Sequence, residues 1–352
     1  MKVIHIESGL GNQMLSYCEY LAMKHCNPDE DCYIETAIYE LPEADSFVSQ
    51  WNGYELDRVF EIQVPNIKGK FSDEQWGNIL DSLARSEFWK KNWNWPVYTQ
   101  HAFEENGLYL ENFRGDFEKE NIEWNISRWK SGAKPPISYR LKQTGLYANA
   151  RRLYRTYAHC EKCMAHPDQL FFINDRNLLT GQRLLFKYRG NKIEDLDEQI
   201  RNAFNFPEIT DEKNKKMAEH ICRSQSVAIH ARRGDMLTAN GKYYKSGYFA
   251  RAVKYIKQKI DKPEIFFFCD SGSMDWCRNN GRIFGLNFDK DRVNFVDWNK
   301  SDESYRDMQL MAMCKHNIVT NSSFGWWGAY LNQNPDKITI SPEIEINTTY
   351  HC

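Results

Sequence analysis

The second half of the chain alternates short β-forming runs with helical runs, and this alternation restricts the fold more than any other feature. From residue 222 onward, strands are expected at 226–231, 264–270, 293–298, 317–321 and 337–340. Helical segments between them are expected at 246–260, 273–280, 302–316 and 323–332. Strands that alternate with helices of this length form a parallel sheet covered on both faces. The sequence therefore predicts an α/β fold.

The length of the chain predicts two domains, because 352 residues exceed the size of one ordinary domain. We expect an amino-terminal domain over residues 1–221 and a carboxy-terminal domain over residues 222–352. The amino-terminal domain begins with a strand, a glycine turn and a helix. A largely helical insert is expected within it at about residues 70–220, with amphipathic helices at 193–204 and 212–223.

Composition and charge exclude several classes of protein. The hydrophobic share is 41% and the net charge is −2, so the chain is neither a disordered segment nor a polycation, and nucleic acid is not an expected partner. The start, MKVIHIESGL, lacks the apolar region of a secretory signal, and no stretch reaches the ~18 apolar residues of a membrane span. We expect a cytoplasmic protein, with peripheral contact to a membrane as an alternative.

One aromatic and basic segment is the candidate for such contact. FWKKNWNWPVY predicts a face that stacks on sugars, a surface that touches anionic lipid, or the packed end of a helix. The side chains concerned are Trp89, Lys90, Lys91, Trp93, Trp95 and Tyr98.

The cysteines indicate free thiols rather than a disulfide framework. The 10 cysteines are scattered, and several lie in apolar contexts, as thiols do in a reducing compartment. The segment HCEKCMAH could supply zinc ligands, but structural zinc sites usually draw their ligands from two separated knuckles. We favour ordinary thiols over a zinc site at His159, Cys160, Cys163 and His166.

Polar and charged residues follow three of the expected strands. HARRGD at 230–235, CDSGS at 269–273 and TNSSFGWW at 320–327 each lie where a strand is expected to end. In a parallel sheet the carboxyl ends of the strands share one edge, and ligands bind in the crevice outside that edge. The three segments are therefore expected to converge on one binding site.

The chemistry of these segments favours a phosphorylated ligand. The guanidinium groups of Arg232 and Arg233 present planar donors that suit phosphate. The start of the last helix offers backbone N–H groups and a dipole that favour an anion, at Asn321, Ser322 and Ser323. Because two phosphate-binding features are expected at the same edge, a nucleotide diphosphate is the predicted ligand.

Each residue also has a structural interpretation. Asp270 at a strand end is expected to accept hydrogen bonds from a ribose or a guanine edge, or to be a turn residue. The arginines could form surface ion pairs and the serines could cap a helix. Trp326 and Trp327 are expected to be packing residues rather than platforms for a sugar. The joint occurrence of the three segments favours the binding site.

Three motifs together resemble the α-1,2-fucosyltransferases. They are SGLGNQMLSY at 8–17, HARRGD at 230–235 and DMQLMAMCKHNIVTNSSFGWWGAYLN at 307–332, and they occur in the family's order across nearly the whole chain. The family patterns are close to GGLGNQMFQY, HxRRGD and NSTFSWWAAWLN. This sequence departs from them at Ser8, Leu15, Gly325 and Gly328, where glycine, phenylalanine, serine and alanine are usual.

The resemblance implies a GT-B-like architecture of two facing Rossmann-type domains, with the donor site in the carboxy-terminal sheet. It implies transfer of L-fucose from GDP-β-L-fucose, with inversion, to the 2-hydroxyl of a galactose-terminated oligosaccharide or lipid-linked glycan, and no metal or other cofactor. An α-1,6 or protein-directed fucosyltransferase, or a catalytically silent GDP- or glycan-binding protein, is the alternative.

The resemblance also assigns residues. His230 would contact the nucleotide, Arg232 the β-phosphate and Asp270 the guanine. The remaining donor-site candidates are Arg233, Asn321 and the diphosphate-binding Ser322, Ser323 and Phe324, with Gly11, Asn12 and Gln13 reaching toward fucose or acceptor.

The expected mechanism rests on charge that develops at the leaving group. As the bond between fucose and phosphate breaks, negative charge grows on the β-phosphate, and Arg232 with helix N–H groups would stabilise it. Arginine is favoured over a metal ion, because none of the D-x-D segments lies at an expected strand end. Asp235 is the candidate proton acceptor, or it orients Arg232 or caps the loop.

Overall fold

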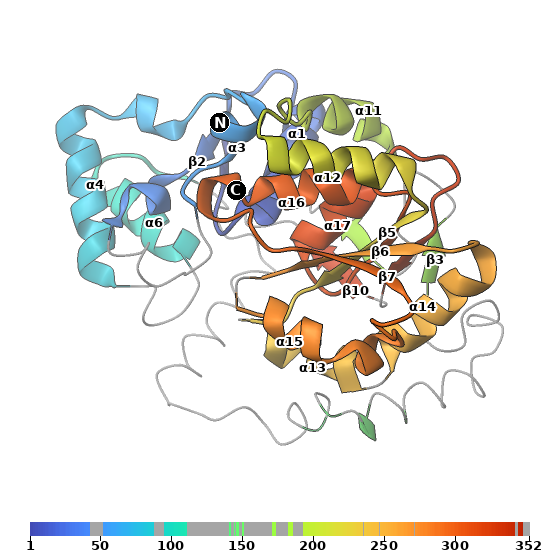
Figure 1. Ribbon diagram of the computed structural model, residues 1–352. Coiled ribbons are helices and arrows are strands. Elements are labelled where there is room, and N and C mark those ends of the chain that lie inside the picture. The colour runs from blue at the N-terminus through green and yellow to red at the C-terminus, as the bar shows by residue number, and fades with distance from the viewer. Residues whose placement is uncertain are drawn as a thin grey trace. The chain divides into compact units, whose positions relative to one another are not determined.

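The computed structural model divides into two compact units, which are described separately (Figure 1). The amino-terminal unit comprises Met1–Lys134, Leu185–Asn205 and Asn347–Cys352, and the carboxy-terminal unit comprises Pro135–Leu184 and Phe206–Ile346. The residues that the structure describes are 1–42, 52–87, 95–110, 141, 144, 146–147, 150, 171–173, 182–185, 193–234, 236–245, 247–270, 272–341 and 344–347.

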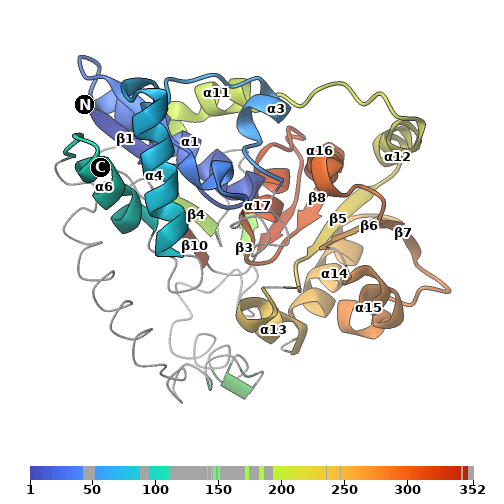
Figure 2. The ribbon, with the colours of Figure 1, turned by 90° about the vertical axis from the view of Figure 1, so that its left-hand side faces the viewer.

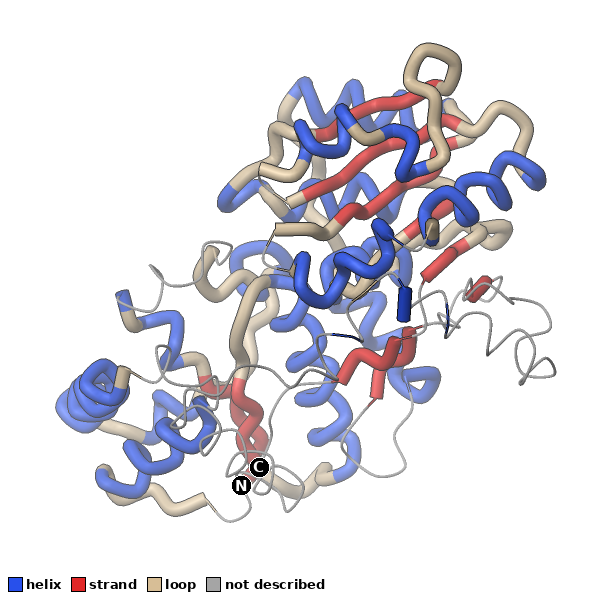
Figure 3. The backbone as a smooth tube through the Cα atoms, turned by 90° about the horizontal axis from the view of Figure 1, so that it is seen from below, coloured by secondary structure: helices blue, strands red, loops and turns tan. Residues whose placement is uncertain are grey.

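A six-stranded sheet forms the centre of the carboxy-terminal unit, and its order is β3-β9-β8-β5-β6-β7. The strands are β3 (Phe171–Ile173), β5 (Ser226–Ala231), β6 (Glu264–Cys269), β7 (Arg292–Val296), β8 (His316–Ile318) and β9 (Thr339–Ser341). All neighbouring pairs are parallel except β3 with β9, which is antiparallel. The strands lie side by side in the tube view of Figure 3.

Helices cover both faces of this sheet, with α12, α16 and α17 on one side and α13, α14 and α15 on the other (Figure 1). Because both faces are covered, all six residues of β5 are buried. The helices are α12 (Glu212–Arg223), α13 (Leu237–Lys245), α14 (Tyr248–Lys259), α15 (Met274–Asn279), α16 (Tyr305–Met313) and α17 (Ser323–Tyr330). Short 3₁₀ turns occupy η3 (Gly281–Phe284) and η4 (Ser301–Glu303).

Aromatic side chains fill much of the core beneath α14. The ring of Phe267 in β6 stacks on Phe295 in β7 at 5.2 Å and meets Phe284 edge to face at 4.8 Å. Phe249 of α14 is fully buried against Phe284 at 4.9 Å. This packing fixes α14 on the sheet and so fixes the chain between β5 and β6.

The amino-terminal unit contains a parallel pair, β1 (Lys2–His5) and β2 (Cys32–Glu35), with His5 directly opposite Glu35. Its helices are α1 (Leu10–Cys26), α3 (Leu56–Phe60), α4 (Asp73–Ser86), α6 (Trp95–Glu105) and α11 (Ile193–Ala203), with η1 (Ala37–Glu40) and η2 (Ile67–Lys70). A separate pair of strands, β4 (Gln182–Leu185) with β10 (Ile344–Asn347), belongs to the carboxy-terminal unit except for the last residue of each strand.

Helix α4 shows why its sequence forms a helix. Ser72 and Gln75 make a reciprocal capping box at its start, so the first N–H groups are satisfied. Trp76, Ile79 and Leu83 recur on one face and are buried. This face packs on α6, where Phe103 is fully buried, and Figure 2 shows the two helices side by side.

The α/β class and the parallel sheet are confirmed. The expected helix at 212–223 matches α12, and the one at 193–204 matches α11 closely. The predicted helix at 302–316 was too long, because β8 already begins at His316. The strands β2 and β3 and the helix α13 were not predicted. In α13 the segment LTANGKYYK contains Asn240 and Gly241, which are typical of loops.

Two further expectations concern the ends of the domains and the membrane. Helix α12 belongs to the carboxy-terminal unit, because it packs on α16. The boundary expected from the sequence, between residues 221 and 222, would instead fall near the end of this helix. Among the helices in the described part of the chain, none is both long and apolar enough to cross a membrane.

Candidate functional site

The order of the strands places a topological switch point between β5 and β8. From β5 the chain moves outward to β6 and β7, and it then crosses to the other side of β5 to form β8 and β9. In sheets of this kind, ligands bind outside the carboxyl ends of the strands at the switch point. The segments that leave β5 and β8 there are HARRGD and TNSSF.

Hydrogen bonds join these two segments directly. The side-chain amide of Asn240, which is fully buried in α13, donates to the carbonyl of Arg232 at 3.0 Å and to the carbonyl of Asn321 at 3.2 Å. Thr320 donates to the carbonyl of His230 at 3.4 Å. The predicted convergence of the two segments is therefore confirmed. Sequence reasoning missed Asn240, because its helix was expected to be a loop.

The third segment reaches the same place through Asp270, which is buried just after β6. One carboxylate oxygen accepts the backbone N–H of Arg233 at 2.6 Å, and the other accepts the N–H of Gly234 at 3.0 Å and the hydroxyl of Ser273 at 2.6 Å. Asp270 thus holds the loop after β5. A contact between this carboxylate and a guanine stays a prediction, and both of its oxygens already accept hydrogen bonds.

The two arginines of the motif have different surroundings. The guanidinium of Arg233 stacks on the ring of Trp276 in α15 at 3.4 Å and lies 5.3 Å from the ring of Tyr244. This arrangement is a cation–π interaction within the fold. Arg232 is half-buried, and its carbonyl accepts a second hydrogen bond, from the hydroxyl of Tyr244 at 3.0 Å. Sequence reasoning missed Tyr244, which lies in a segment expected to be a loop, and Trp276, which is far from the motif in sequence.

His230 is buried and neutral at the end of β5. Burial and, after it, the positive charge of Arg232 lower its pKa to about 3, although Asp270 acts in the opposite direction. Among the described residues, its Nδ1 has no hydrogen-bond partner. The ring lies 5.8 Å from that of Phe324, at the start of α17. A neutral imidazole in this position can donate one hydrogen bond and accept another.

Gly325 in the first turn of α17 allows this close approach of His230. A Cβ at this position would lie 2.9 Å from Cγ of His230 and closer still to Nδ1. Real Cβ atoms do not approach so closely, so a side chain at residue 325 would displace the imidazole. Gly325, which stands where serine is usual in the α-1,2-fucosyltransferase pattern, thus leaves the space that His230 occupies.

Helix α17 is oriented with its amino end at the switch point. Ser322 precedes it in an extended conformation, and its side chain makes no capping hydrogen bond. At the other end the buried ammonium of Lys337 donates to the carbonyls of Ala329 and Asn332 at 3.0 and 2.8 Å. A cation at the carboxyl end complements the helix dipole, whose positive end faces the site. Trp326 and Trp327 are buried, which confirms them as packing residues.

The candidates from the first motif lie in the amino-terminal unit. The first turn of α1, which starts at Leu10, contains Gly11, Asn12 and Gln13. The glycine turn before this helix is therefore shorter than predicted. The amide of Gln13 donates to the carbonyls of Ser8 and Gly53, at 2.9 Å each, and accepts the N–H of Glu55 at 2.8 Å. Gln13 therefore fixes the loop before α1.

Several predicted residues lie outside the described part of the chain. They are Asp235, the aromatic and basic residues Trp89, Lys90, Lys91 and Trp93, and the zinc candidates His159, Cys160, Cys163 and His166. Tyr98 of the aromatic segment is described, and it packs against the hydrophobic cluster between α4 and α6.

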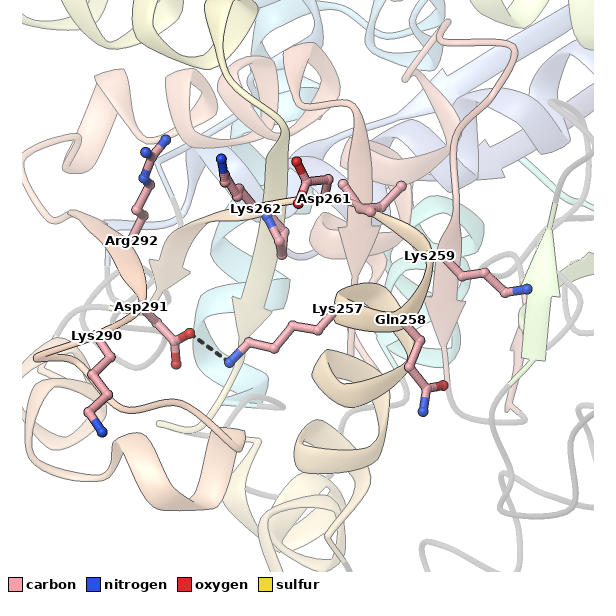
Figure 4. A pocket seen from close by; sticks show the side chains of 10 residues that line it. Lys257, Gln258, Lys259, Asp261, Lys262, Lys290, Asp291 and Arg292 are labelled. Atoms are coloured by element: carbon pink, nitrogen blue, oxygen red, sulfur yellow. Dashed lines mark hydrogen bonds and ion pairs between the residues drawn. The ribbon is translucent and has the colours of Figure 1, made fainter.

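One open depression lies away from this site, at the amino ends of β6 and β7 (Figure 4). Its volume is about 610 Å³, and half of its lining residues are basic. Lys257 and Asp291 form an ion pair across it at 2.7 Å. Because it adjoins the opposite edge of the sheet from HARRGD, it is separate from the candidate site. It is lined by Lys257, Gln258, Lys259, Ile260, Asp261, Lys262, Pro263, Lys290, Asp291 and Arg292.

The sheet and its loops define an α/β unit with a candidate site at a switch point, and part of the chain is similar to a known family of enzymes. Residues 197–351 match the model of Glycosyl transferase family 11. The match includes HARRGD and NSSFGWW, so the resemblance to the α-1,2-fucosyltransferases is confirmed over the part of the chain that carries these two motifs.

Individual relatives are similar over a limited part of their length. An alpha-1,2-colitosyltransferase of Escherichia coli is 32% identical over 134 residues, which are 36% of this chain and 43% of the relative. The galactoside alpha-(1,2)-fucosyltransferase 1 of Saimiri sciureus is 29% identical over 148 residues, 39% of this chain and 38% of the relative. The chain thus spans about two fifths of the length of the curated relatives that it matches.

Among solved structures, the NodZ alpha-1,6-fucosyltransferase co-crystallized with GDP aligns with 97% of both chains. The TM-score is 0.36 and the identity is 14%, which is too low to transfer the role of any residue.

Proposed function

We propose that this protein is a glycosyltransferase that moves L-fucose from GDP-β-L-fucose, with inversion, to the 2-hydroxyl of a galactose-terminated glycan. The observation that carries the proposal is the junction of HARRGD with the start of α17, which Asn240 makes through the carbonyls of Arg232 and Asn321. The family match over residues 197–351 supports it. So do the names of the relatives, which are colitosyl- and fucosyltransferases.

The donor's diphosphate would lie between Arg232 and the amino end of α17. Phosphate oxygens would accept hydrogen bonds from the guanidinium and from the helix, with Asn321, Ser322, Ser323 and Phe324 around them. His230, neutral and buried, would contact the nucleotide through a hydrogen bond rather than through charge. Asp270 and Arg233 would hold the loop after β5 in its conformation without contacting the diphosphate.

In the proposed reaction, the acceptor oxygen forms a bond to the anomeric carbon of fucose while the bond from that carbon to the β-phosphate oxygen breaks. The electron pair of the broken bond passes to the phosphate, and the proton of the acceptor hydroxyl passes to a base. Arg232 and the helix would stabilise the growing negative charge, and no metal ion is required. Asp235 is proposed either to accept the proton or to orient Arg232.

The first experiment is a transfer assay with the purified chain and GDP-fucose. A panel of galactose-terminated oligosaccharides, with and without excess EDTA, is offered as acceptors, and the linkage of the product is determined by NMR. We expect an α-1,2 product in both conditions. Tight binding of GDP without transfer to any acceptor would indicate a silent binding protein, and loss with EDTA that manganese restores would overturn the metal-free mechanism.

The same assay separates the remaining alternatives. An α-1,6 linkage, or transfer to a protein, would place the chain with other fucosyltransferases. A colitosyl donor is included because one relative is named a colitosyltransferase. Preference for that donor over GDP-fucose would change the proposed sugar while leaving the role of Arg232 unchanged.

A further inference from the structure

Two cysteine side chains lie in contact beside the candidate site. Cys269 is the last residue of β6 and is paired with Ala231, the last residue of β5. Cys277 lies in α15 and is fully buried. Their sulfur atoms are 3.3 Å apart, a distance at which one thiol donates to the other. Both cysteines are free thiols, and both belong to the same unit as HARRGD.

The segment between the two cysteines carries the contacts that hold the loop after β5. The carboxylate of Asp270 accepts the N–H of Arg233 and the hydroxyl of Ser273, at 2.6 Å each. The ring of Trp276, the residue before Cys277, lies 3.4 Å from the guanidinium of Arg233. A movement of one cysteine relative to the other therefore changes the support of this loop.

The backbone of the segment would transmit such a movement. The N–H of Cys277 donates to the carbonyl of Ser273 at 3.0 Å, and the N–H of Ser273 donates to the carbonyl of Asp270 at 3.1 Å. Strand β6 is paired with β5 on one side and with β7 on the other, so its end is fixed in the sheet. Helix α15 has only six residues. If the two sulfur atoms approach each other, α15 is the part that moves.

The two thiols need only a small displacement to form a disulfide. The S–S bond is shorter than their present contact by about 1.3 Å. Cys269 is partly exposed whereas Cys277 is fully buried, so an oxidant reaches Cys269 first. The hydrogen bond with Cys277 and burial hold the pKa of the Cys269 thiol well above its usual range. Because the thiolate is the reactive form, oxidation should become faster as the pH rises.

We propose that Cys269 and Cys277 form an oxidation site, at which hydrogen peroxide closes a disulfide and loosens the loop after β5. The peroxide transfers one oxygen atom to the sulfur of Cys269, which gives a sulfenic acid and one water. The sulfur of Cys277 then attacks this sulfur. The S–S bond forms, the S–O bond breaks, and the hydroxyl leaves as a second water with the thiol proton. Two thiols lose two electrons in total, and one peroxide is reduced to two waters.

The disulfide acts on the loop through the two residues that α15 and its preceding turn supply. When α15 moves toward β6, Trp276 shifts relative to Arg233, and the hydroxyl of Ser273 shifts relative to Asp270. The N–H groups of Arg233 and Gly234, which donate to Asp270, should then exchange faster with solvent. A looser loop should also bind GDP more weakly, and this last step alone rests on the proposed function.

The test exposes the purified full-length chain to hydrogen peroxide at mildly alkaline pH until the exposed Cys222 is completely oxidised. Trypsin leaves the pair in one peptide, residues 260–278, because it does not cleave between Lys262 and Pro263. We expect this peptide to lose two hydrogen atoms in the mass spectrum. It should resist alkylation until dithiothreitol is added.

Hydrogen exchange measured by mass spectrometry reports on the loop without any ligand. Loss of one hydrogen bond or of the stacking on Trp276 predicts that residues 232–234 exchange at least about tenfold faster in the oxidised protein. GDP affinity, measured by calorimetry, should fall by a similar factor. Both properties should return to the initial values after reduction with dithiothreitol.

Three variants assign the effect to the pair. Cys277→Ser should show neither response to peroxide, whereas its untreated form keeps wild-type exchange and GDP affinity. Cys269→Ser, at the partly exposed position, gives the same test if the buried substitution prevents folding. Cys222→Ser, in the last turn of α12, is the matched control and should respond to peroxide as the wild type does.

The outcomes separate this inference from the proposed function. Absence of the disulfide after complete oxidation of Cys222 would overturn the inference, and so would a sulfinic acid at Cys269 in its place. A disulfide that leaves the exchange of residues 232–234 unchanged would show that the pair does not control the loop. If the reduced protein neither binds GDP nor transfers a sugar, the proposed function fails, and the mass and exchange measurements still decide this inference.

Discussion

Asp270 accepts the backbone N–H of Arg233 at 2.6 Å, and through this bond the end of β6 fixes the loop that follows β5. Its second oxygen accepts the N–H of Gly234 and the hydroxyl of Ser273. In Asp270→Ala these donors lose their acceptor, at a cost of about 1–3 kcal/mol for each buried group left unpaired. We expect a lower melting temperature together with weaker GDP binding, measured by calorimetry. Weaker GDP binding at an unchanged melting temperature would show instead that the carboxylate serves the nucleotide.

The two neighbouring arginines should respond differently to lysine. Arg233→Lys loses the stacking on Trp276, an interaction worth about 0.5–2 kcal/mol, so the melting temperature should fall. Arg232→Lys keeps the charge but loses the planar fork, and turnover should fall about a hundredfold or more with a smaller loss of donor affinity. Steady-state kinetics and melting are compared for both variants. Near-normal turnover in Arg232→Lys would exclude Arg232 as the group that stabilises the leaving phosphate.

Gly325→Ser should displace His230, because even a Cβ at this position would collide with the imidazole. We expect GDP affinity to fall at least tenfold, and the melting temperature to fall as well. Gly241→Ala in α13 is the control, since its Cβ would meet no atom closer than 4.0 Å, and it should be neutral or stabilising by up to about 1 kcal/mol. A Gly325→Ser protein with wild-type affinity for GDP would show that the imidazole need not occupy this position.

Stability should depend on pH through His5. Burial lowers its pKa, but the carboxylates of Glu35 and Glu7 outweigh burial and raise the pKa to about 10 in the folded protein, against about 6.5 for an unperturbed histidine. The folded state therefore binds this proton more tightly than the unfolded state, and the stabilisation is complete below about pH 6.5 and is lost as the pH rises toward 10. Melting temperatures between pH 6 and 10 should fall more steeply for the wild type than for His5→Asn. Equal slopes would contradict the ionised state of His5.

Ser8→Gly should stabilise the protein. The left-handed conformation of Ser8 costs a residue with a Cβ about 1–2 kcal/mol, and glycine adopts it without this penalty. The hydrogen bonds from Gln13 and Tyr39 reach the carbonyl of Ser8, so the substitution retains them. The free energy of unfolding is measured with denaturant. A loss of stability would show that the hydroxyl of Ser8 has a structural role.

The convergence of the site could be predicted from sequence because it follows from topology. Parallel strands end at one edge, so HARRGD, CDSGS and NSSF had to lie near each other once the strands were recognised. The partners inside the site could not be predicted in this way. Asn240 lies in a helix whose sequence is typical of a loop, and Trp276 meets Arg233 through tertiary packing that leaves no local pattern.

The contacts of His5 with Glu7 and Glu35 were not predicted, for a related reason. Glu7 and His5 are close in sequence, but Glu35 comes from β2, which was not predicted. Without the pairing of β1 with β2 there was no sign that His5 has a carboxylate on either side. Asp270 was predicted either to contact a ribose or a guanine or to be a turn residue. Its hydrogen bonds to the loop could be seen only from the backbone positions of Arg233 and Gly234.

The order of the strands has a consequence for the way the protein is made. On the ribosome, β5, β6 and β7 emerge before β8 and can pair with each other, but the place beside β5 at the switch point stays vacant until β8 arrives. A nascent chain that ends before Asn321 lacks the second carbonyl to which Asn240 donates. If the chain binds a nucleotide diphosphate as proposed, binding would require synthesis to continue past Asn321, and a chain that ends earlier would not compete for GDP.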